Sequence, residues 1–211
     1  MNFEELGVRE DLLHGITEMG FESPMPVQEK VIPVLLGDEV RDVVALAQTG
    51  TGKTAAFGLP VIQRIDTSIR RPQALIIAPT RELCLQIAGD LADFSKYTPE
   101  LSVLPVYGGS SIESQIRALR TGVQIIVATP GRLIDLINRG VVKLGDVHTV
   151  VLDEADEMLN MGFIDDINQI LSHVPEDRRM LMFSATMPKE VAKIANKFMQ
   201  SPMEIVVGTR N

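Results

Sequence analysis

Short apolar runs recur along the chain and alternate with segments of helical periodicity. The runs predict strands near residues 43–46, 74–78, 103–106, 124–128, 149–152, 180–183 and 204–207. Runs that are apolar on both faces are typical of a parallel sheet covered by helices. Between them, apolar residues share one helical face, as do Leu83, Ile87, Leu91 and Phe94. The alternation predicts a doubly wound, mainly parallel α/β domain with right-handed crossovers.

In a sheet of this kind, ligands bind beside the carboxyl ends of the strands. The residues that follow each apolar run are therefore the candidates for chemistry. One of these segments also contains a helix start, since Ser110 with Glu113 predicts a capping box.

The segment after the first run has the pattern of a phosphate-binding loop. Its residues are Gln48, Thr49, Gly50, Thr51, Gly52, Lys53 and Thr54. The glycines let backbone N–H groups point at phosphate oxygens, and the helix that follows adds favourable partial charge at its N-terminus. Lys53 can reach the outer phosphates, and the Thr54 hydroxyl can ligate magnesium. The strict pattern has glycine at position 47, but the small Ala47 still permits close backbone approach.

Acidic residues follow the run at 149–152. A carboxylate at the end of a buried strand is unfavourable unless it binds a partner. Beside a phosphate loop, that partner would be the magnesium of a bound nucleotide, held by Asp153. Glu154 can position and activate water for attack on the terminal phosphate. The alternative is a pair of carboxylates favoured by a helix dipole, but the two motifs together indicate a nucleoside triphosphatase with Lys53, Asp153 and Glu154 as catalytic residues.

Further motifs follow in order along the chain. They are Gly20-Phe21 through Gln28, the phosphate loop, Pro79-Thr80-Arg81-Glu82-Leu83, Gly108-Gly109, Thr129-Pro130-Gly131-Arg132, Asp153-Glu154-Ala155-Asp156 and Ser184-Ala185-Thr186. With these motifs the chain resembles, nearly end to end, the first RecA-like domain of a DEAD-box ATP-dependent RNA helicase. Within that family it looks closest to the bacterial cold-shock-associated members. The resemblance implies a RecA-like P-loop NTPase fold, ATP with Mg²⁺, and RNA as a partner.

The resemblance assigns the N-terminal stretch to adenine recognition. Glutamine can pair with the N6 and N7 edge of adenine, and Gln28 matches the family residue that does so. The aromatic that packs near the base would be Phe21 or Phe3, although core packing is the alternative for either. The family usually has threonine where this chain has Met25, which would be a poor N-cap.

The domain boundaries follow from these assignments. We expect residues 1–30 to form the adenine-recognition segment, 31–207 the RecA-like ATP-binding domain, and 208–211 the start of an interdomain linker. Glu39-Val40-Arg41 look like a small insertion before the phosphate-loop strand, and the sequence assigns them no function.

Three motifs resemble the family's RNA-binding face. Their residues are Pro79, Thr80 and Arg81, then Gly108 and Gly109, then Thr129, Pro130, Gly131 and Arg132. Helix N-termini and glycine amides bind phosphates without net basic charge. Caps and turns of an ordinary α/β domain are the alternative for any one motif. Contacts to the RNA backbone imply little sequence specificity, and the 2′-hydroxyl would select RNA over DNA.

By the same resemblance, the hydroxyls of Ser184 and Thr186 should bond to the acidic signature through Asp156. This contact would couple the nucleotide state to RNA binding. The alternative is a polar turn that caps the helix after it.

Composition narrows the class of protein. The chain has 211 residues, of which 45% are hydrophobic and 23% charged, as in a soluble globular domain. No run approaches the ~20 apolar residues of a membrane span, and the acidic N-terminus is unlike a signal peptide. The lone Cys84 cannot form an internal disulfide, which fits a reducing cytoplasm, and we expect it to be a small buried helix residue. We also expect the protein to be a monomer. Because the net charge is −8, RNA contact must use local geometry rather than bulk charge.

Two other functions remain as alternatives to the ATP-binding half of an RNA helicase. A P-loop motor acting on DNA or protein is disfavoured by the adenine-recognition residues and by Ala155 within the acidic signature. A catalytically silent RNA-binding module is disfavoured by the intact Lys53, Asp153 and Glu154. The family's arginine-rich motif lies in a second RecA-like domain, and no arginine cluster follows Thr186. We therefore expect the chain alone to bind nucleotide and RNA weakly and not to unwind duplexes.

Overall fold

The structure is a computed structural model of the chain and is described for residues 1–208. Residues 209–211, which make up most of the expected linker, lie outside the described residues. Within residues 1–208, no helix combines the length and apolar character needed to cross a membrane.

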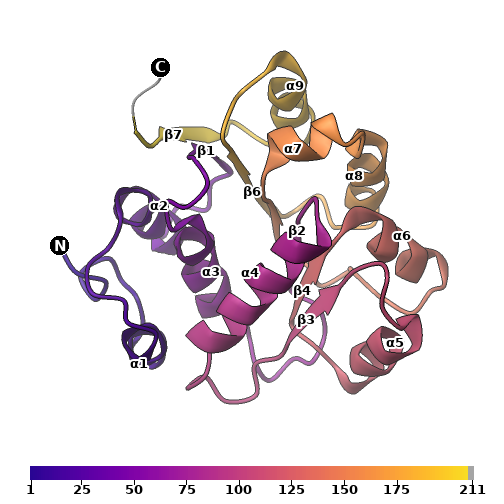
Figure 1. Cartoon of the computed structure of the whole chain (residues 1–211), viewed down its shortest axis with the longest axis horizontal. Helices are drawn as coiled ribbons and strands as arrows, with labels where there is room; N and C mark the ends of the chain where they lie inside the picture. The colour runs from indigo at the N-terminus through magenta and orange to yellow at the C-terminus, as the bar shows by residue number, and fades with distance from the viewer. Residues whose placement is uncertain (209–211) are drawn as a thin grey trace.

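A single sheet of seven strands forms the centre of the molecule (Figure 1). The strands are β1 (Val43–Leu46), β2 (Ala74–Ile77), β3 (Val103–Val106), β4 (Ile125–Ala128), β5 (Thr149–Leu152), β6 (Arg179–Ser184) and β7 (Met203–Val206). Their order across the sheet is β3-β4-β2-β5-β6-β1-β7, and every neighbouring pair is parallel. The α/β, doubly wound class predicted from the sequence is confirmed.

Helices fill the connections between the strands. They are α1 (Glu10–Glu18), α2 (Pro26–Leu36), α3 (Lys53–Gln63), α4 (Arg81–Phe94), α5 (Ile112–Thr121), α6 (Pro130–Asn138), α7 (Ala155–Asn160), α8 (Ile164–Leu171) and α9 (Lys189–Phe198). The predicted cap of α5 is wrong by one residue. Ser111 is the N-cap, and its hydroxyl accepts from Ser114 N.

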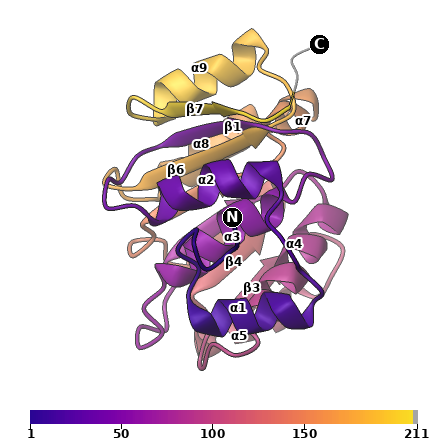
Figure 2. The same ribbon diagram turned by 90° about the vertical axis from the view of Figure 1, so that its left-hand side faces the viewer.

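The strand side chains divide between two cores, one on each face of the sheet. Along β1, Val43 and Ala45 belong to the core beneath α1–α4, whereas Val44 belongs to the core beneath α5–α9. Figure 2 views the first of these layers, with α1, α2 and α3 in front of the strands. Burial on both faces explains why each strand is an apolar run rather than an alternating one.

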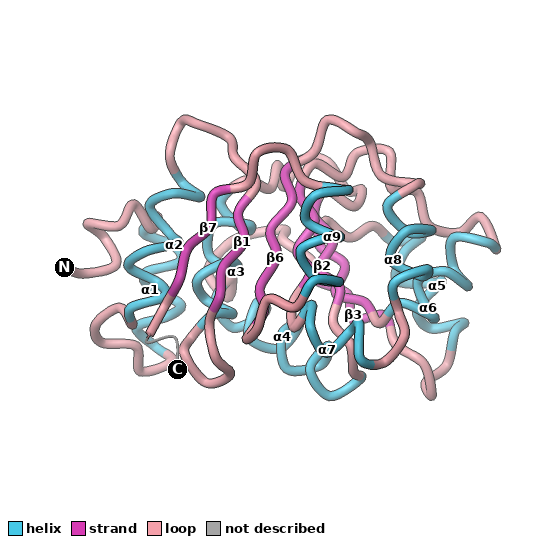
Figure 3. Tube along the Cα trace, turned by 90° about the horizontal axis from the view of Figure 1, so that it is seen from above, coloured by secondary structure: helices cyan, strands magenta, loops and turns pink. Residues whose placement is uncertain are grey.

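The two outer strands differ from the central ones, which the apolar runs alone did not predict. Strand β3 is the edge beyond β4, and three of its four residues are only partly buried. Its Pro105 has no N–H to donate, which suits an edge position. Strand β7 forms the other edge, beside β1 (Figure 3).

The parallel arrangement gathers the ends of all strands at one edge of the sheet. The phosphate loop follows β1, Asp153 follows β5, and Ser184 ends β6. The three segments expected to contact RNA follow β2, β3 and β4, which are neighbours in the sheet. The strand order therefore separates the segments expected to bind nucleotide from those expected to contact RNA.

Helix α4 has the buried face that its periodicity predicts. Cys84, Ile87, Leu91 and Phe94 are buried, and Leu83 is partly buried. The Cys84 thiol donates to the carbonyl of Val127 at 3.1 Å, and burial raises its pKa to about 11. The cysteine is therefore a protonated core residue.

Helix α1 approaches the end of α4 backbone to backbone at Gly15. A Cβ atom at Gly15 would lie 2.3 Å from the carbonyl oxygen of Phe94. Only glycine permits this contact without moving one of the two helices.

Substitution of Gly15 by alanine should destabilise the fold, because the added methyl group must displace α1. We expect Gly15→Ala to lower the free energy of unfolding by about 1–3 kcal/mol in urea denaturation. Gly89→Ala is the matched control, since Gly89 is an exposed residue of helix α4 with open space around its Cβ position. Gly89→Ala should raise the free energy of unfolding by up to about 1 kcal/mol. Equal losses in the two variants would contradict the packing argument.

Candidate nucleotide and nucleic-acid site

The phosphate loop has the backbone that its glycines require. Gly50 and Gly52 adopt left-handed conformations, with φ of 80° and 82°. The Thr51 hydroxyl donates to the carbonyl of Gln48 at 2.6 Å and closes the turn. Gln48, Thr49 and Gly50 are exposed, so the loop is open to a ligand. Helix α3 begins at Lys53 directly after it, which places a helix N-terminus behind the turn.

Position 47, where the sequence departs from the strict pattern, extends the sheet by one residue. Ala47 donates its N–H to the carbonyl of Ser184 at 3.0 Å, and its side chain is 2% exposed. A methyl group is accommodated in the core at this point. The departure therefore leaves the loop intact.

Lys53 joins the loop to the acidic signature. Its Nζ atom lies 3.0 Å from Asp153 Oδ1 and 3.6 Å from Glu154 Oε1. Asp153 is fully buried, and only 8% of the Lys53 side chain is exposed. The two catalytic carboxylates predicted from the sequence thus share one ammonium group.

Among residues 1–208, the second carboxylate oxygen of Asp153 has no hydrogen-bond partner. Oδ2 is buried and forms no hydrogen bond, whereas Oδ1 accepts from Lys53 and from the backbone N–H of Glu154. Burial raises the pKa of the Asp153 carboxyl, against the opposing effect of the Lys53 ammonium. A buried, orphaned carboxylate oxygen is a suitable ligand for a hard cation such as Mg²⁺.

The surrounding residues fit a magnesium ion that is shared with a nucleotide. Within residues 1–208 no cluster of three His, Cys, Asp or Glu side chains can hold a metal alone. Magnesium typically takes one or two carboxylates together with phosphate oxygens and waters. The partly exposed Thr54, one residue after Lys53, is the second protein ligand predicted from the sequence.

Glu154 adopts a strained backbone conformation. Its φ and ψ are 54° and 53°, in the left-handed region that non-glycine residues rarely occupy. Its side chain is one quarter exposed, beside the fully buried Asp153. Strain of this kind collects at functional sites, where the surrounding structure fixes the direction of a side chain.

Asp156 connects the acidic signature to the Ser184-Ala185-Thr186 segment. Its Oδ2 atom accepts from the Thr186 hydroxyl at 2.9 Å and from the Thr186 N–H at 3.2 Å. Its own N–H donates to the Ser184 hydroxyl, which in turn donates to the Thr186 carbonyl. The contacts expected between these residues are present, and they tie the end of β5 to the end of β6.

Gln28 contacts the phosphate loop directly. Its Nε2 donates to the carbonyl of Gly52 at 3.0 Å, and its Oε1 accepts from the N–H of Met25 at 2.9 Å. The amide retains one N–H and one lone pair for a base edge, although the residue is only 2% exposed. Met25 is also close to the loop, since a Cβ at Gly52 would lie 2.8 Å from its sulfur. The sequence analysis missed this proximity, because nothing local predicts it.

The two candidate aromatics pack into the core beneath α1. Phe21 lies between Phe3 and Phe94, with ring centroids 5.9 Å from each. Phe3 is buried, and Phe21 is partly buried. The structure therefore gives both rings a packing role, and a contact between Phe21 and adenine stays a prediction.

The segments after β2 and β3 meet at Arg81. Its guanidinium lies 5.1 Å from the centre of the Tyr107 ring, and a Cβ at Gly109 would be 3.2 Å from its Nη1. Gly109 has a φ of 82°, so a side chain there would be strained as well as crowded. Thr80 caps α4 as expected, with its hydroxyl accepting from Leu83 N at 3.2 Å. Tyr107 was missed in the sequence, although an aromatic next to two glycines is a usable signal.

The Arg132 side chain makes its hydrogen bonds to other residues of this chain. Its guanidinium donates to the carbonyl of Ser110 and to Gln115 Oε1, and Gln115 Nε2 donates to the carbonyl of Tyr107. These bonds hold the loop that carries Gly108 and Gly109. Gln115 was also missed, because no sequence pattern distinguishes it. Thr129 and Pro130 begin α6 beside this loop as the N-cap and the first helical residue.

Fold and site together define a P-loop nucleotide-binding domain of the RecA-like class. The chain belongs to the DEAD/DEAH box helicase family, whose profile matches residues 25–194.

Named relatives support this membership across almost the whole chain. The chain is 53% identical over 200 residues to the DEAD-box ATP-dependent RNA helicase CshA of Geobacillus kaustophilus, covering 95% of this chain and 42% of the relative. It is 47% identical to the ATP-dependent RNA helicase DeaD of Escherichia coli, covering 96% of this chain and 32% of the relative. The crystal structure of a DEAD box protein from Methanococcus jannaschii superimposes with a TM-score of 0.93 at 44% identity, over 99% of this chain and 56% of that one. The chain thus spans less than half the length of the two helicases.

Removal of Lys53 alone should destabilise the nucleotide-free fold. Lys53→Met leaves a fully buried carboxylate without its partner, so we expect a loss of about 3–5 kcal/mol in urea denaturation. Adding Asp153→Asn should recover part of that loss, because the orphaned charge is removed. Lys193→Met is the control at an exposed position and should change stability by less than about 0.5 kcal/mol. A Lys53→Met variant as stable as the unmodified chain would refute the contact.

Proposed function

We propose that the chain is the ATP-binding and catalytic half of a DEAD-box RNA helicase, which couples ATP hydrolysis to RNA binding and local duplex unwinding. The observation that carries the proposal is the buried Asp153, with one oxygen on Lys53 and the other free, at the edge that holds the phosphate loop. Two of the similar proteins are named ATP-dependent RNA helicases. The proposal includes a cytoplasmic, monomeric protein with a second RecA-like domain.

The phosphate loop binds the polyphosphate of ATP in this proposal. Backbone N–H groups at Gly50 and Gly52 and the N-terminus of α3 face the phosphate oxygens. Lys53 exchanges its contact with Asp153 for the outer phosphates, a move that needs only a side-chain rotation. Asp153 and Thr54 would hold magnesium together with the nucleotide, and the ion would supply positive charge that offsets the charge of the phosphates.

Glu154 positions the attacking water and accepts its proton. Its left-handed backbone conformation fixes the direction in which the side chain leaves the main chain. The remaining charge stabilisation at the terminal phosphate would come from an arginine of the second domain, a contribution of about 10³–10⁵ in rate for related ATPases.

Asp156 transmits the nucleotide state in this proposal. It links the acidic signature to Ser184 and Thr186 through the bonds described above. A shift of Glu154 or Asp153 on hydrolysis would therefore move the ends of β5 and β6 together.

RNA would lie across the ends of β2, β3 and β4. The N-termini of α4 and α6 and the Gly108-Gly109 loop present N–H groups to its phosphates, with Pro79, Thr80, Gly131 and the neighbouring residues setting their positions. In this arrangement Arg132 positions the loop, and Arg81, stacked on Tyr107, offers a charge. Few side chains reach toward bases, so binding would show little sequence specificity.

Nucleotide choice tests the role of Gln28. If its free N–H and lone pair read adenine, ADP should bind more tightly than GDP, and Gln28→Ala should lose about 1–3 kcal/mol of that discrimination in calorimetry. Gln28→Ala should also weaken the binding of both nucleotides, because the hydrogen bond from Gln28 to the Gly52 carbonyl is lost. Equal affinities for ADP and GDP in the unmodified chain would refute the adenine assignment.

ATPase and unwinding assays test the function as a whole. We expect the 211-residue chain to show little RNA-stimulated hydrolysis, and a chain joined to the second RecA-like domain of a relative to show it strongly. In the joined protein, Glu154→Gln should cut hydrolysis and leave nucleotide binding nearly intact, whereas Lys53→Ala should weaken binding. Robust unwinding by the short chain, or stimulation by DNA equal to that by RNA, would contradict the proposal.

A further inference from the structure

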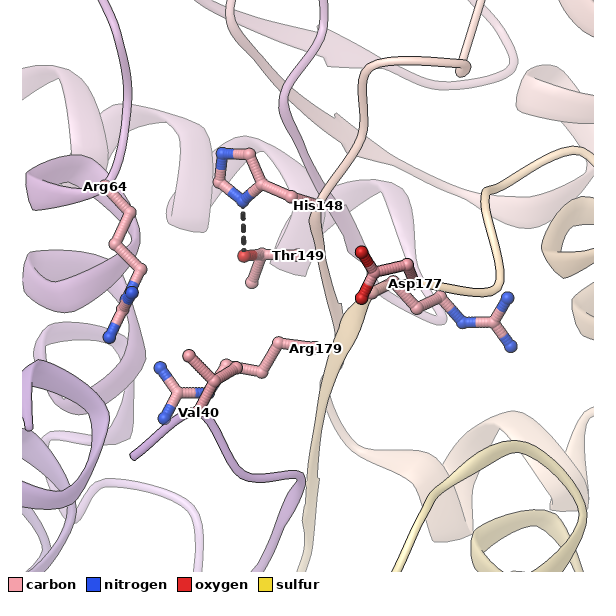
Figure 4. Close-up of a pocket in the computed structure, with 7 residues that line it drawn as sticks. Val40, Arg64, His148, Thr149, Asp177 and Arg179 are labelled. Carbon is pink, nitrogen blue, oxygen red and sulfur yellow. Dashed lines mark hydrogen bonds between the residues drawn. The ribbon is translucent and has the colours of Figure 1, made fainter. Parts of the chain in front are cut away.

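A second pocket opens at the opposite end of the strands from the nucleotide site. It has a volume of about 450 Å³ and lies at Thr149 and Arg179, the first residues of β5 and β6 (Figure 4). Asp153 follows the other end of β5, so the whole length of the strand separates the two sites. No step of the proposed ATPase mechanism uses this pocket.

Three arginines line the pocket without a carboxylate partner. Among the ion pairs within residues 1–208, none includes Arg64, Arg178 or Arg179. Figure 4 shows Arg64 and Arg179 extending into the same space from opposite sides. Burial and the nearby charge of Arg64 lower the pKa of Arg179 to about 10. The guanidiniums of Arg64 and Arg179 repel one another.

The end of α2 explains part of this cluster. Arg64 and Arg179 both donate to the carbonyl of Leu35 at 2.8 Å, Arg64 also reaches Gly37, and Arg179 also reaches Arg41. Cations are favourable there, but a helix C-terminus carries only about half a negative charge. Two guanidiniums exceed that charge, and the buried carboxylate of Asp42, which also acts on Arg179, offsets only one of them, so part of the positive potential is left over for another partner.

Orphaned donors point to the same conclusion. Among the described residues, three buried side-chain atoms lack a hydrogen-bond partner, namely Arg64 Nε, Arg178 Nε and Asp153 Oδ2. The last marks the magnesium position of the nucleotide site. The other two belong to residues that line this pocket. The Arg178 guanidinium is held by the carbonyls of Val174 and Pro175, so Arg64 is the relevant donor. A buried unsatisfied N–H is unfavourable, so a rotation that turns Arg64 Nε toward an anion in the pocket would be favoured.

His148 and Thr149 add neutral polar groups to the wall. His148 Nδ1 lies 2.9 Å from the Thr149 hydroxyl (Figure 4). Burial, together with the charge of Arg64, lowers the pKa of His148, so the imidazole is neutral at pH 7. A neutral imidazole keeps Nε2 available to a ligand.

The segment Glu39-Val40-Arg41, to which the sequence assigned no function, forms another wall. Val40 lines the pocket, and the carbonyl of Arg41 holds Arg179 Nε at 2.8 Å. One negative side chain, the exposed Asp177, also lines the pocket. Its carboxylate opposes an incoming anion and limits affinity.

We propose that this pocket binds a phosphate group, as free inorganic phosphate or as a small phosphate monoester. Planar guanidiniums suit the oxygens of a phosphate, and a dianion neutralises more of the excess charge than a carboxylate does. The volume accommodates a phosphate with a small organic group attached. The inference is independent of the proposed ATPase function.

The test is a titration of the ¹⁵N-labelled chain with inorganic phosphate, followed by NMR at constant ionic strength. We expect saturable shifts of the amide signals of Val40, Thr149 and Asp177. The signals of Gly50 and Gly52 report separately on the phosphate loop, so failure of one site is distinguishable from failure of the other. Shifts at the pocket that stay linear with concentration would overturn the proposal.

Charge variants decide whether the arginines and Asp177 act as stated. Arg64→Gln should raise the dissociation constant at least tenfold, and Asp177→Asn should lower it several-fold. Arg71→Gln is the matched control, because Arg71 is exposed, pairs with Asp146 and lies outside the pocket. If Arg64→Gln unfolds the chain, Asp177→Asn still decides, since its side chain is exposed. An unchanged constant in Asp177→Asn would overturn the proposal.

A third titration separates the sources of the phosphate. Ribose 5-phosphate should shift the same amide signals as inorganic phosphate if the pocket takes monoesters, whereas shifts with inorganic phosphate alone would assign it to the free ion. Ribose itself should leave the signals unchanged. Saturable shifts with ribose would show that a sugar, not a phosphate, is recognised, and would overturn the proposal.

Discussion

The nucleotide site depends on one buried contact, between the ammonium of Lys53 and the carboxylate of Asp153. It joins the start of α3 to the end of β5 across the intervening strand β6. Removing two charges from water is costly, and a contact of this kind stabilises a fold only when the remaining oxygens are satisfied. Here one oxygen is left free. A carboxylate oxygen without a hydrogen-bond partner at the centre of a well-packed domain is explained if a ligand binds to it.

The strands were predictable because the parallel sheet buries both of their faces. An apolar run such as residues 149–152 stands out against its polar flanks, and its end marks the place where ligands bind. The order of the strands was not predictable in the same way. The run at 103–106 has nearly the same composition as the central ones, yet β3 lies at an edge, where Pro105 leaves no unpaired N–H.

Local motifs were visible in the sequence, and contacts between distant loops were not. The phosphate loop and the acidic signature are contiguous, so their chemistry can be read from neighbouring residues. The bond of Gln28 to Gly52 and the stacking of Arg81 on Tyr107 depend on which loops the strand order brings together. The same limit applies to the second pocket, at the start of β5 and β6, whose arginines come from the end of α3 and the start of β6.

The position of β1 within the sheet has a consequence for how the chain folds during synthesis. Its two hydrogen-bonded neighbours are β6 and β7, the last two strands in the sequence. Contacts so distant along the chain form late, because a long loop must close first. Translation at about 5–20 residues per second adds to the delay. The strand that presents the phosphate loop therefore stays unpaired on both edges until nearly the whole described chain has left the ribosome, and the nucleotide site is the last part of the domain to take shape.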